Sequence, residues 1–184
     1  LKKTYNIRVM NLSLGRPVFE SYKTDPLCQA VEAAWKSGIV VVVAAGNFGR
    51  SNPTTSQGYA TIASPGNDPY VITVGAMKHM GTPSRTDDLI ASYSSKGPSY
   101  LDRVVKPDLV APGNLMVSGL NPQTVTITGL PAFTQTRLDL SAYTTQTSGK
   151  SMDYYTLNGT SMATPVVSGA AALMLQKNSR LTPD

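Results

Sequence analysis

Three short apolar runs in the first half of the chain have the pattern of β-strands. Residues 39–43 form a continuous β-branched run, which is typical of a strand buried on both faces of a sheet. Residues 7–15 show a second strand pattern that ends in glycine, and residues 70–74 show a third. The pattern therefore predicts three strands, one of which has no solvent-facing side.

A helix is predicted between the first two strands. Asp25 followed by Pro26 is typical of an N-cap and a first helical position, and Gly38 suits the residue just beyond the last turn. The residues expected on its buried face are Leu27, Ala30, Val31 and Ala34. A strand, a helix and a second strand form a right-handed unit whose strands run parallel. The predicted fold class is α/β, with a parallel sheet flanked by helices.

Ligand sites in open parallel sheets lie beyond the carboxyl ends of the strands. Gly15 and Asn47 both lie at such ends, so a site formed by this architecture is expected beside them. Gly46-Asn47 is also a common turn sequence. The residues alone therefore leave open whether Asn47 ends a strand or serves a site.

A helix of small apolar residues is predicted over 166–175, and Ser161 lies at its mouth between Gly159 and Ala163. The N-terminus of a helix stabilises negative charge, and small neighbours leave room for a substrate carbonyl. Ser161 or Thr160 could equally be an ordinary N-cap. Position alone leaves both the nucleophile and the cap open.

Composition narrows the classes of function. The 184 residues suit a single domain, and 41% of them are hydrophobic and 15% charged. The net charge of +5 comes from Lys and Arg scattered singly, so no nucleic-acid partner is expected. No apolar run approaches the roughly 18 residues of a membrane span. Cys28 is the only cysteine, so no disulfide can form within the chain.

Three segments resemble motifs of the subtilisin-like serine peptidase family, in the family's order. Residues 159–165, Gly-Thr-Ser-Met-Ala-Thr-Pro, resemble its nucleophile motif, and residues 44–47, Ala-Ala-Gly-Asn, resemble its oxyanion motif. Residues 13–15, Ser-Leu-Gly, resemble its substrate-binding segment. The resemblance implies a serine endopeptidase that cleaves peptides or proteins through an acyl-enzyme. It makes Ser161 the nucleophile and Asn47 an oxyanion donor beside the backbone N–H of Ser161.

The resemblance also implies which residues bind substrate. The backbone of Ser13, Leu14 and Gly15 would pair with an extended peptide. Residues 63–66 resemble one wall of the primary specificity pocket, where the X-Pro bond is often cis, so a cis Ser64–Pro65 bond is expected. The residues expected to line that pocket are Leu14, Ala44, Ala45, Gly46 and Ala63. Their small apolar side chains suggest an uncharged substrate side chain.

The resemblance covers residues 7–113 and 157–184, whereas residues 114–156 fit poorly. This Thr-rich stretch contains alternating segments such as 125–128, and it is expected to be an ordered insertion, a hairpin or lid, or else a mobile loop. Tyr154 and Tyr155 are expected to pack it down. The chain is therefore interpreted as one domain, 1–184, with a Thr-rich insertion at about 114–156.

A serine nucleophile needs a histidine base and an acid that orients it, and the family's motifs for both precede the segments found here. Neither motif occurs. His79, the only histidine, follows Asn47 instead of preceding it, so His79 is not expected to be the base. Lys150 is not expected to be the base either.

The chain is therefore expected to be the C-terminal portion of a catalytic domain, completed by an upstream segment of the same gene product. Leu1 as the first residue and a helix start at 181–184 agree with this expectation. On this interpretation the sheet is incomplete in this chain. Exposed apolar surface, and with it association or instability, is expected.

Two other hypotheses stay open. One is a catalytically inactive subtilisin-like domain that binds peptides along Ser13-Leu14-Gly15, which an upstream sequence without the histidine motif would favour. The other is a generic α/β binding domain with accidental motif similarity. The resemblance implies no required cofactor, and no metal ligand is predicted. Calcium often stabilises such peptidases, but no acidic cluster places an ion. Secretion is expected from the family alone.

Overall fold

The computed structural model describes residues 1–51, 57–119 and 136–184, and the chain divides into two compact units. Unit 1 comprises Leu1–Asn114 and Gly159–Asp184, and unit 2 comprises Leu115–Asn158. The strands of the two units belong to separate sheets. Each unit is therefore described by itself.

Unit 1 is built on a parallel sheet. Four strands run parallel in the order β1-β2-β3-β5, with bounds Val9–Leu12, Val40–Ala44, Ile72–Lys78 and Leu109–Pro112. A short strand, β4 (Leu89–Ile90), pairs antiparallel with the end of β3. The predicted α/β class with a parallel sheet is confirmed. The first strand, however, is shorter than the apolar pattern over residues 7–15 predicts.

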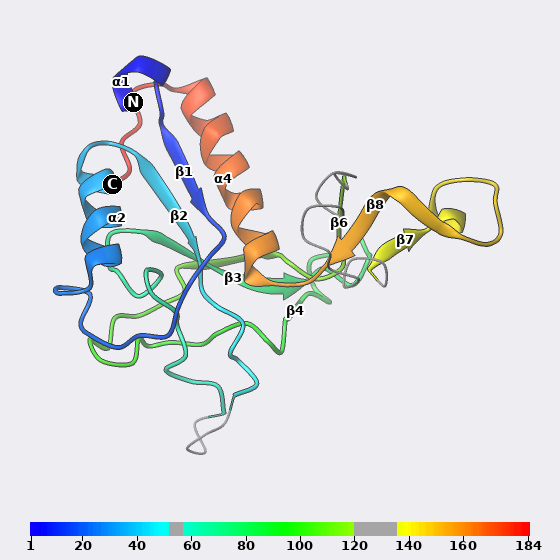
Figure 1. The fold of residues 1–184 in the computed structure, drawn as a ribbon, viewed down its shortest axis with the longest axis horizontal. Helices are drawn as coiled ribbons and strands as arrows, with labels where there is room; N and C mark the ends of the chain where they lie inside the picture. The colour runs from blue at the N-terminus through cyan, green and yellow to red at the C-terminus, as the bar shows by residue number, and fades with distance from the viewer. Residues whose placement is uncertain (52–56, 120–135) are drawn as a thin grey trace. The chain divides into compact units, whose positions relative to one another are not determined.

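The second strand, β2, lies in the middle of the core. All five of its residues are buried, and it pairs on both edges, Val9 with Val40 and Val42 with Ile72. A strand without a polar face needs a cover on both sides of the sheet. The helices α2 (Pro26–Lys36) and α4 (Thr160–Lys177) provide it from opposite sides (Figure 1).

The helix α2 begins where the sequence predicts but buries a different face. Asp25 caps it, and the Asp25 carboxylate accepts a hydrogen bond from the Leu27 N–H, 2.9 Å. The residues that α2 buries are Cys28, Val31 and Trp35. The expected face was wrong at Ala30, which is exposed, because turning Trp35 inward removes more apolar surface from water than burying an alanine.

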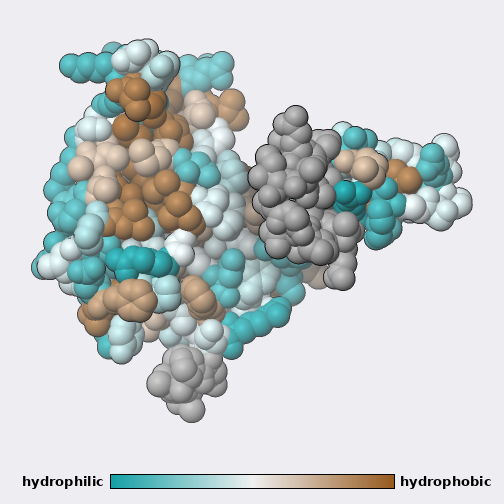
Figure 2. Space-filling view, viewed as in Figure 1, coloured by the Kyte–Doolittle hydropathy of each residue, from teal (hydrophilic) through white to brown (hydrophobic). Residues whose placement is uncertain are grey.

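The helix α4 is apolar on nearly every side. One face packs on the sheet, while Val166, Leu173 and Met174 on the outside are 41%, 67% and 60% exposed. A helix that is apolar all round is typically covered all round. Figure 2 shows further apolar residues over β1, whose outer edge pairs with no other strand among the described residues. Unit 1 therefore presents apolar surface on β1 and on α4.

The remaining short elements of unit 1 are irregular. A four-residue helix, α1 (Lys2–Tyr5), precedes β1. Three X-Pro bonds in the described residues are cis: Ser64–Pro65, Gly97–Pro98 and Lys106–Pro107. The expectation of a cis Ser64–Pro65 bond is confirmed. No helix in the described part of the chain is both long enough and apolar enough to span a bilayer.

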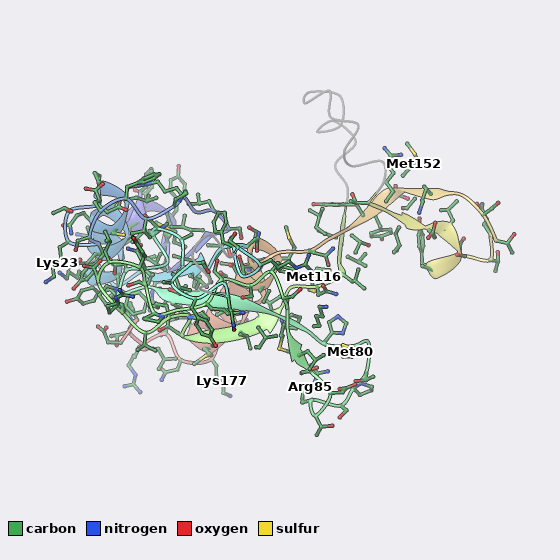
Figure 3. The ribbon with its side chains drawn as sticks, turned by 90° about the horizontal axis from the view of Figure 1, so that it is seen from below. Lys23, Met80, Arg85, Met116, Met152 and Lys177 are labelled. Atoms are coloured by element: carbon green, nitrogen blue, oxygen red, sulfur yellow. The ribbon has the colours of Figure 1, made fainter. Side chains whose placement is uncertain are left out.

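Unit 2 is an antiparallel sheet of three strands. The order is β6-β8-β7, with bounds Met116–Gly119, Lys150–Leu157 and Arg137–Asp139, and a 3₁₀ turn, η2 (Leu140–Ala142), follows β7. Figure 3 labels Met116 on β6 and Met152 on β8. Tyr154 packs edge-on against Tyr143, and the Tyr143 hydroxyl donates to Ser151 Oγ, 2.7 Å. The alternating stretch at 125–128 lies outside the described residues.

Candidate active site

A cavity of about 320 Å³ lies beyond the carboxyl ends of β1 and β2, at the N-terminus of α4. The residues that line it are Leu14, Gly15, Ala44, Gly46, Asn47, Phe48, Ala63, Thr160 and Ser161. Seven of these are candidate site residues from the sequence. None of the described residues that line it carries a charge, so the cavity suits an uncharged group.

Ser161 and Ser13 are joined by two hydrogen bonds. The Ser161 hydroxyl donates to the Ser13 carbonyl oxygen, 3.1 Å, and the Ser13 hydroxyl donates to the Ser161 carbonyl oxygen, 2.8 Å. The Ser161 carbonyl is free to accept because Pro165, one turn further on, has no N–H to offer. Ser13 therefore fixes the start of α4 from the end of β1 instead of lining the cavity.

The N-terminus of α4 supplies the electrostatics of the site. Ser161 is the second residue of an 18-residue helix whose N-cap is Gly159. A first-turn N–H has no acceptor within the helix, and the helix dipole is positive at this end. The Ser161 N–H and hydroxyl therefore lie where an anionic oxygen would be stabilised.

The Asn47 amide is oriented by Thr160. Its Oδ1 accepts hydrogen bonds from the backbone N–H of Thr160, 3.0 Å, and from Thr160 Oγ1, 3.1 Å. With the oxygen held in this way, Nδ2 remains available as a donor at the cavity. A Cβ atom at Gly159 would lie 3.3 Å from Nδ2, so glycine there keeps the amide uncrowded.

Sequence reasoning missed Thr160 and Ser95 as parts of the site. Thr160 Oγ1 also accepts from the Gly46 N–H, 3.2 Å, and Ser95 Oγ accepts from the Phe48 N–H, 3.2 Å. These two side chains hold the turn after β2 in place. A local sequence pattern does not predict such contacts, because the first joins residues separated by 114 positions and the second joins residues separated by 47.

Ala45 takes a different position from its neighbours. It is fully buried and does not line the cavity, so its expected place in the pocket wall was wrong. Its carbonyl oxygen instead accepts from the Ala63 N–H, 2.9 Å. This backbone hydrogen bond ties Ala45 to the wall residue Ala63.

His79 and Lys150 lie away from the cavity lining. His79 lies in the loop between β3 and β4, together with Met80 and Arg85 (Figure 3), and its Nδ1 accepts from the Gly81 N–H, 3.1 Å. Lys150 belongs to unit 2, where its ammonium pairs with Asp139, 2.7 Å. Neither residue lines the cavity at Ser161.

The described residues offer no metal centre. Over 1–51, 57–119 and 136–184, no three His, Cys, Asp or Glu side chains are grouped so that they could hold an ion. Subtilisins carry calcium as a structural ion. No residue set for calcium can be named here.

Comparison with known proteins gives the same family throughout. A model of the subtilase family matches residues 4–184. The serine protease AprX of Bacillus subtilis is 41% identical over 180 residues, which are 97% of this chain and 36% of that protease. Subtilisin DY of Bacillus licheniformis is 35% identical over 174 residues, 95% of this chain and 44% of the relative.

Solved structures agree with these relatives. A cold-adapted subtilisin-like serine proteinase is 30% identical with a TM-score of 0.56, covering 95% of this chain and 44% of its own. Sphericase is 26% identical with a TM-score of 0.62, covering 99% and 47%. The chain thus spans less than half the length of each of these four proteins. On the match over residues 4–184, this chain belongs to the subtilase family of serine proteases.

Proposed function

We propose that this chain carries the nucleophile and the oxyanion hole of a serine endopeptidase that hydrolyses peptide bonds through an acyl-enzyme. The observation that carries the proposal is the cavity where the Ser161 hydroxyl, the N-terminus of α4 and the Asn47 amide converge. Family membership supports the reaction class. The roles of the individual residues are inferred from their geometry.

In the proposed reaction, Ser161 Oγ attacks the carbonyl carbon of a substrate peptide bond. The hydroxyl proton passes to a histidine supplied by a segment that precedes this sequence, where an acid orients that histidine. The carbonyl oxygen becomes an oxyanion, which accepts hydrogen bonds from Asn47 Nδ2 and the Ser161 N–H. The C–N bond then breaks, the amine leaves with the proton, and water hydrolyses the Ser161 ester.

Substrate binding is proposed at two places. The backbone of Ser13-Leu14-Gly15, beyond the end of β1, would pair with an extended peptide or protein strand. The side chain before the scissile bond would enter the cavity between Gly15, Gly46 and Ala63. Because the cavity lining is uncharged, an uncharged side chain is the expected occupant.

The partner of this chain is proposed to be the upstream segment itself. The open outer edge of β1 and the exposed apolar side of α4 support this, since both are surfaces that a sheet and a helix normally cover. Nucleic acid is not proposed as a partner. Export from the cytoplasm is proposed on family resemblance alone, and assaying culture supernatant against cell lysate would test it.

A second function is favoured by one observation. The Ser161 hydroxyl donates to a backbone carbonyl, and among the described residues no base lines the cavity. A catalytically inactive subtilisin-like domain that binds peptides along Ser13-Leu14-Gly15 would have the same arrangement.

Covalent labelling with a fluorophosphonate probe separates the two functions. The probe is applied to this chain and to a longer protein that includes the upstream segment, and the modified peptide is located by mass. Labelling of Ser161 in the longer protein, lost in its Ser161→Ala variant, is expected. If neither protein is labelled while both bind a peptide in a calorimeter, the peptide-binding function replaces the endopeptidase.

A further inference from the structure

An ionic network centred on the buried carboxylate of Asp25 adjoins two walls of the cavity, and its cationic member, Arg16, is partly exposed. The Arg16 guanidinium pairs with the Asp25 carboxylate, 2.9 Å between Nη2 and Oδ1. The other carboxylate oxygen of Asp25 accepts from the Ser64 hydroxyl, 2.6 Å. Asp25 and Ser64 are both fully buried. The Asp25 carboxylate therefore joins Arg16, which comes after β1, to Ser64, which lies in the 63–66 segment between β2 and β3.

These two residues adjoin the cavity walls. Arg16 follows Gly15 in sequence, Ser64 follows Ala63, and both Gly15 and Ala63 line the cavity. The backbones of Arg16 and Ser64 pair through two hydrogen bonds, N–H to O in each direction and each 2.9 Å. A Cβ atom added to Gly15 would lie 2.9 Å from Ala63 Cβ. The two walls therefore approach so closely that residue 15 has no room for a side chain.

Asp25 keeps its charge in this position. Burial acts to raise the pKa of its carboxyl, but hydrogen bonds from Ser64 and Leu27, with the Arg16 charge, outweigh burial and lower the pKa below its ordinary value. The neighbouring Cys28 thiol is neutral, because burial raises its pKa to about 12. A buried carboxylate whose partners converge from separate segments holds those segments together strongly, since losing either partner leaves a charge uncompensated.

A helix cap alone does not account for this arrangement. Asp25 already caps α2 through its bond to the Leu27 N–H, and an exposed serine or asparagine can serve as a cap equally well. The bonds to Arg16 and Ser64 do nothing for the helix. They connect only the segments that form the cavity walls.

We infer that Asp25 is a positioning residue for the substrate cavity, acting through Arg16 and Ser64 to hold the Gly15 and Ala63 walls at a fixed spacing. It thereby sets the size of the substrate side chain that the cavity accepts. The effect on substrate choice rests on the proposed endopeptidase function. The effect on the walls does not.

We call the contacts among Arg16, Asp25 and Ser64 the clamp. Two variants separate the effect of the clamp from the effect of the helix cap. Asp25→Asn weakens both, whereas Ser64→Ala removes one arm of the clamp and leaves the bond to the Leu27 N–H. The control is Leu175→Ala, which removes a buried side chain near the C-terminal end of α4. Leu175 lines a separate pocket with Val9 at the amino end of β1, away from the cavity at the N-terminus of α4.

The first measurement uses the longer protein and peptides that differ only in the residue before the scissile bond, alanine, leucine or phenylalanine. In wild type, the fixed walls are expected to give unequal kcat/KM values. In Asp25→Asn and Ser64→Ala the ratio of the best to the worst peptide is expected to shrink by about tenfold, through KM more than kcat. Leu175→Ala is expected to keep the wild-type ratio even though it unfolds more easily.

The second measurement needs no activity. Amide hydrogen exchange is followed at Arg16 and Ser64, whose N–H groups bridge the walls, and at Leu27. Both clamp variants are expected to speed exchange at Arg16 and Ser64 by about tenfold over Leu175→Ala, while Ser64→Ala leaves Leu27 unchanged. Exchange at the bridge that matches the control in both clamp variants would overturn the inference. A wild type that cleaves no peptide would overturn the proposed function, and the exchange data would still decide the clamp.

Discussion

Asn47 owes its orientation to one neighbour. Thr160 gives its N–H and its hydroxyl to the same amide oxygen, so the side chain cannot turn over without losing two hydrogen bonds. Preorganised donors of this kind stabilise charge in a transition state at no cost of reorientation. Replacing the threonine hydroxyl or the amide should therefore act on the chemical step.

Changing Asn47 to leucine in the longer protein is expected to lower kcat by about 10²–10³, the loss known for removing such a donor from a subtilisin and carried over here. The KM value should change little, because a ground-state carbonyl does not yet occupy the oxyanion position. Steady-state hydrolysis of a chromogenic peptide measures both constants. Thr160→Ser, which keeps the hydroxyl, is the control. A raised KM at unchanged kcat would mean that Asn47 only binds substrate.

Asp68 is a buried carboxyl with a pronounced response to pH. It is fully buried, its Oδ1 accepts from the Tyr70 N–H at 2.8 Å, and its Oδ2 has no hydrogen-bond partner among the described residues. Burial raises its pKa from 3.8 to about 6, and Glu32 on α2 adds to the rise while Lys36 and Lys106 oppose it. The folded chain therefore holds this proton at pH values where the unfolded chain has released it.

Stability should fall as the pH rises from about 4 to about 6, because over this window the folded state binds more protons than the unfolded state. The full effect is roughly 2–3 kcal/mol and is reached above pH 6. Urea unfolding of the chain across this range measures it, and Asp68→Asn should flatten the curve. Asp25, whose pKa is lowered, acts elsewhere: its stabilisation is lost only as the pH falls below about 4. A wild-type curve that is flat between pH 4 and 6 would refute the assignment.

Among the elements, those with a strong local pattern could be predicted. The β-branched run of β2 allows no solvent-facing side, and Asp25-Pro26 marks the start of α2 with little ambiguity. The parallel pairing of β1 with β2 then follows from the right-handed connection of strand, helix and strand. The buried face of α2 could not be predicted from spacing alone, because Trp35 competes with the alanines and its area decides the rotation.

The candidate site was predictable as far as its motifs reach. Asn47 follows the carboxyl end of β2 and Ser161 lies at the N-terminus of α4, where a parallel sheet places its ligand site. Both residues line the cavity. The supporting side chains were not predictable. Thr160, Ser95 and the second role of Asp25 depend on contacts between residues far apart in sequence, and serine, threonine and aspartate are too common in loops to signal them.

At the scale of the whole chain, the points where the backbone leaves unit 1 and returns to it form a junction within unit 1. The Gly159 N–H donates to the Gly113 carbonyl oxygen, 2.9 Å, and the Tyr93 hydroxyl donates to the same oxygen, 2.7 Å. The chain therefore leaves unit 1 and returns to it at neighbouring positions.

Replacing residues 115–158 with a short Gly-Ser linker is expected to leave unit 1 folded, since the bonds of Gly113 with Gly159 and Tyr93 lie outside the replaced segment. The bond between the Leu115 N–H and Asn158 Oδ1 lies within that segment and is lost with it. Circular dichroism of the shortened chain should show a cooperative thermal transition within a few degrees of the one that belongs to unit 1 in the full chain. Removing the hydrogen bond between the Tyr93 hydroxyl and the Gly113 carbonyl with Tyr93→Phe tests the junction separately, and a small lowering of that transition is expected. Loss of cooperativity on shortening would mean that unit 1 depends on unit 2.

The adjacency of Gly113 and Gly159 also governs how much length the intervening segment can take up. When the ends of a loop are fixed beside each other, the entropy lost on closing it grows only with the logarithm of its length, about 0.6 kcal/mol for each doubling. Residues can therefore be added to or removed from this segment at small thermodynamic cost. The turn that presents Ser161, two residues beyond the junction, keeps its geometry while its neighbour changes size.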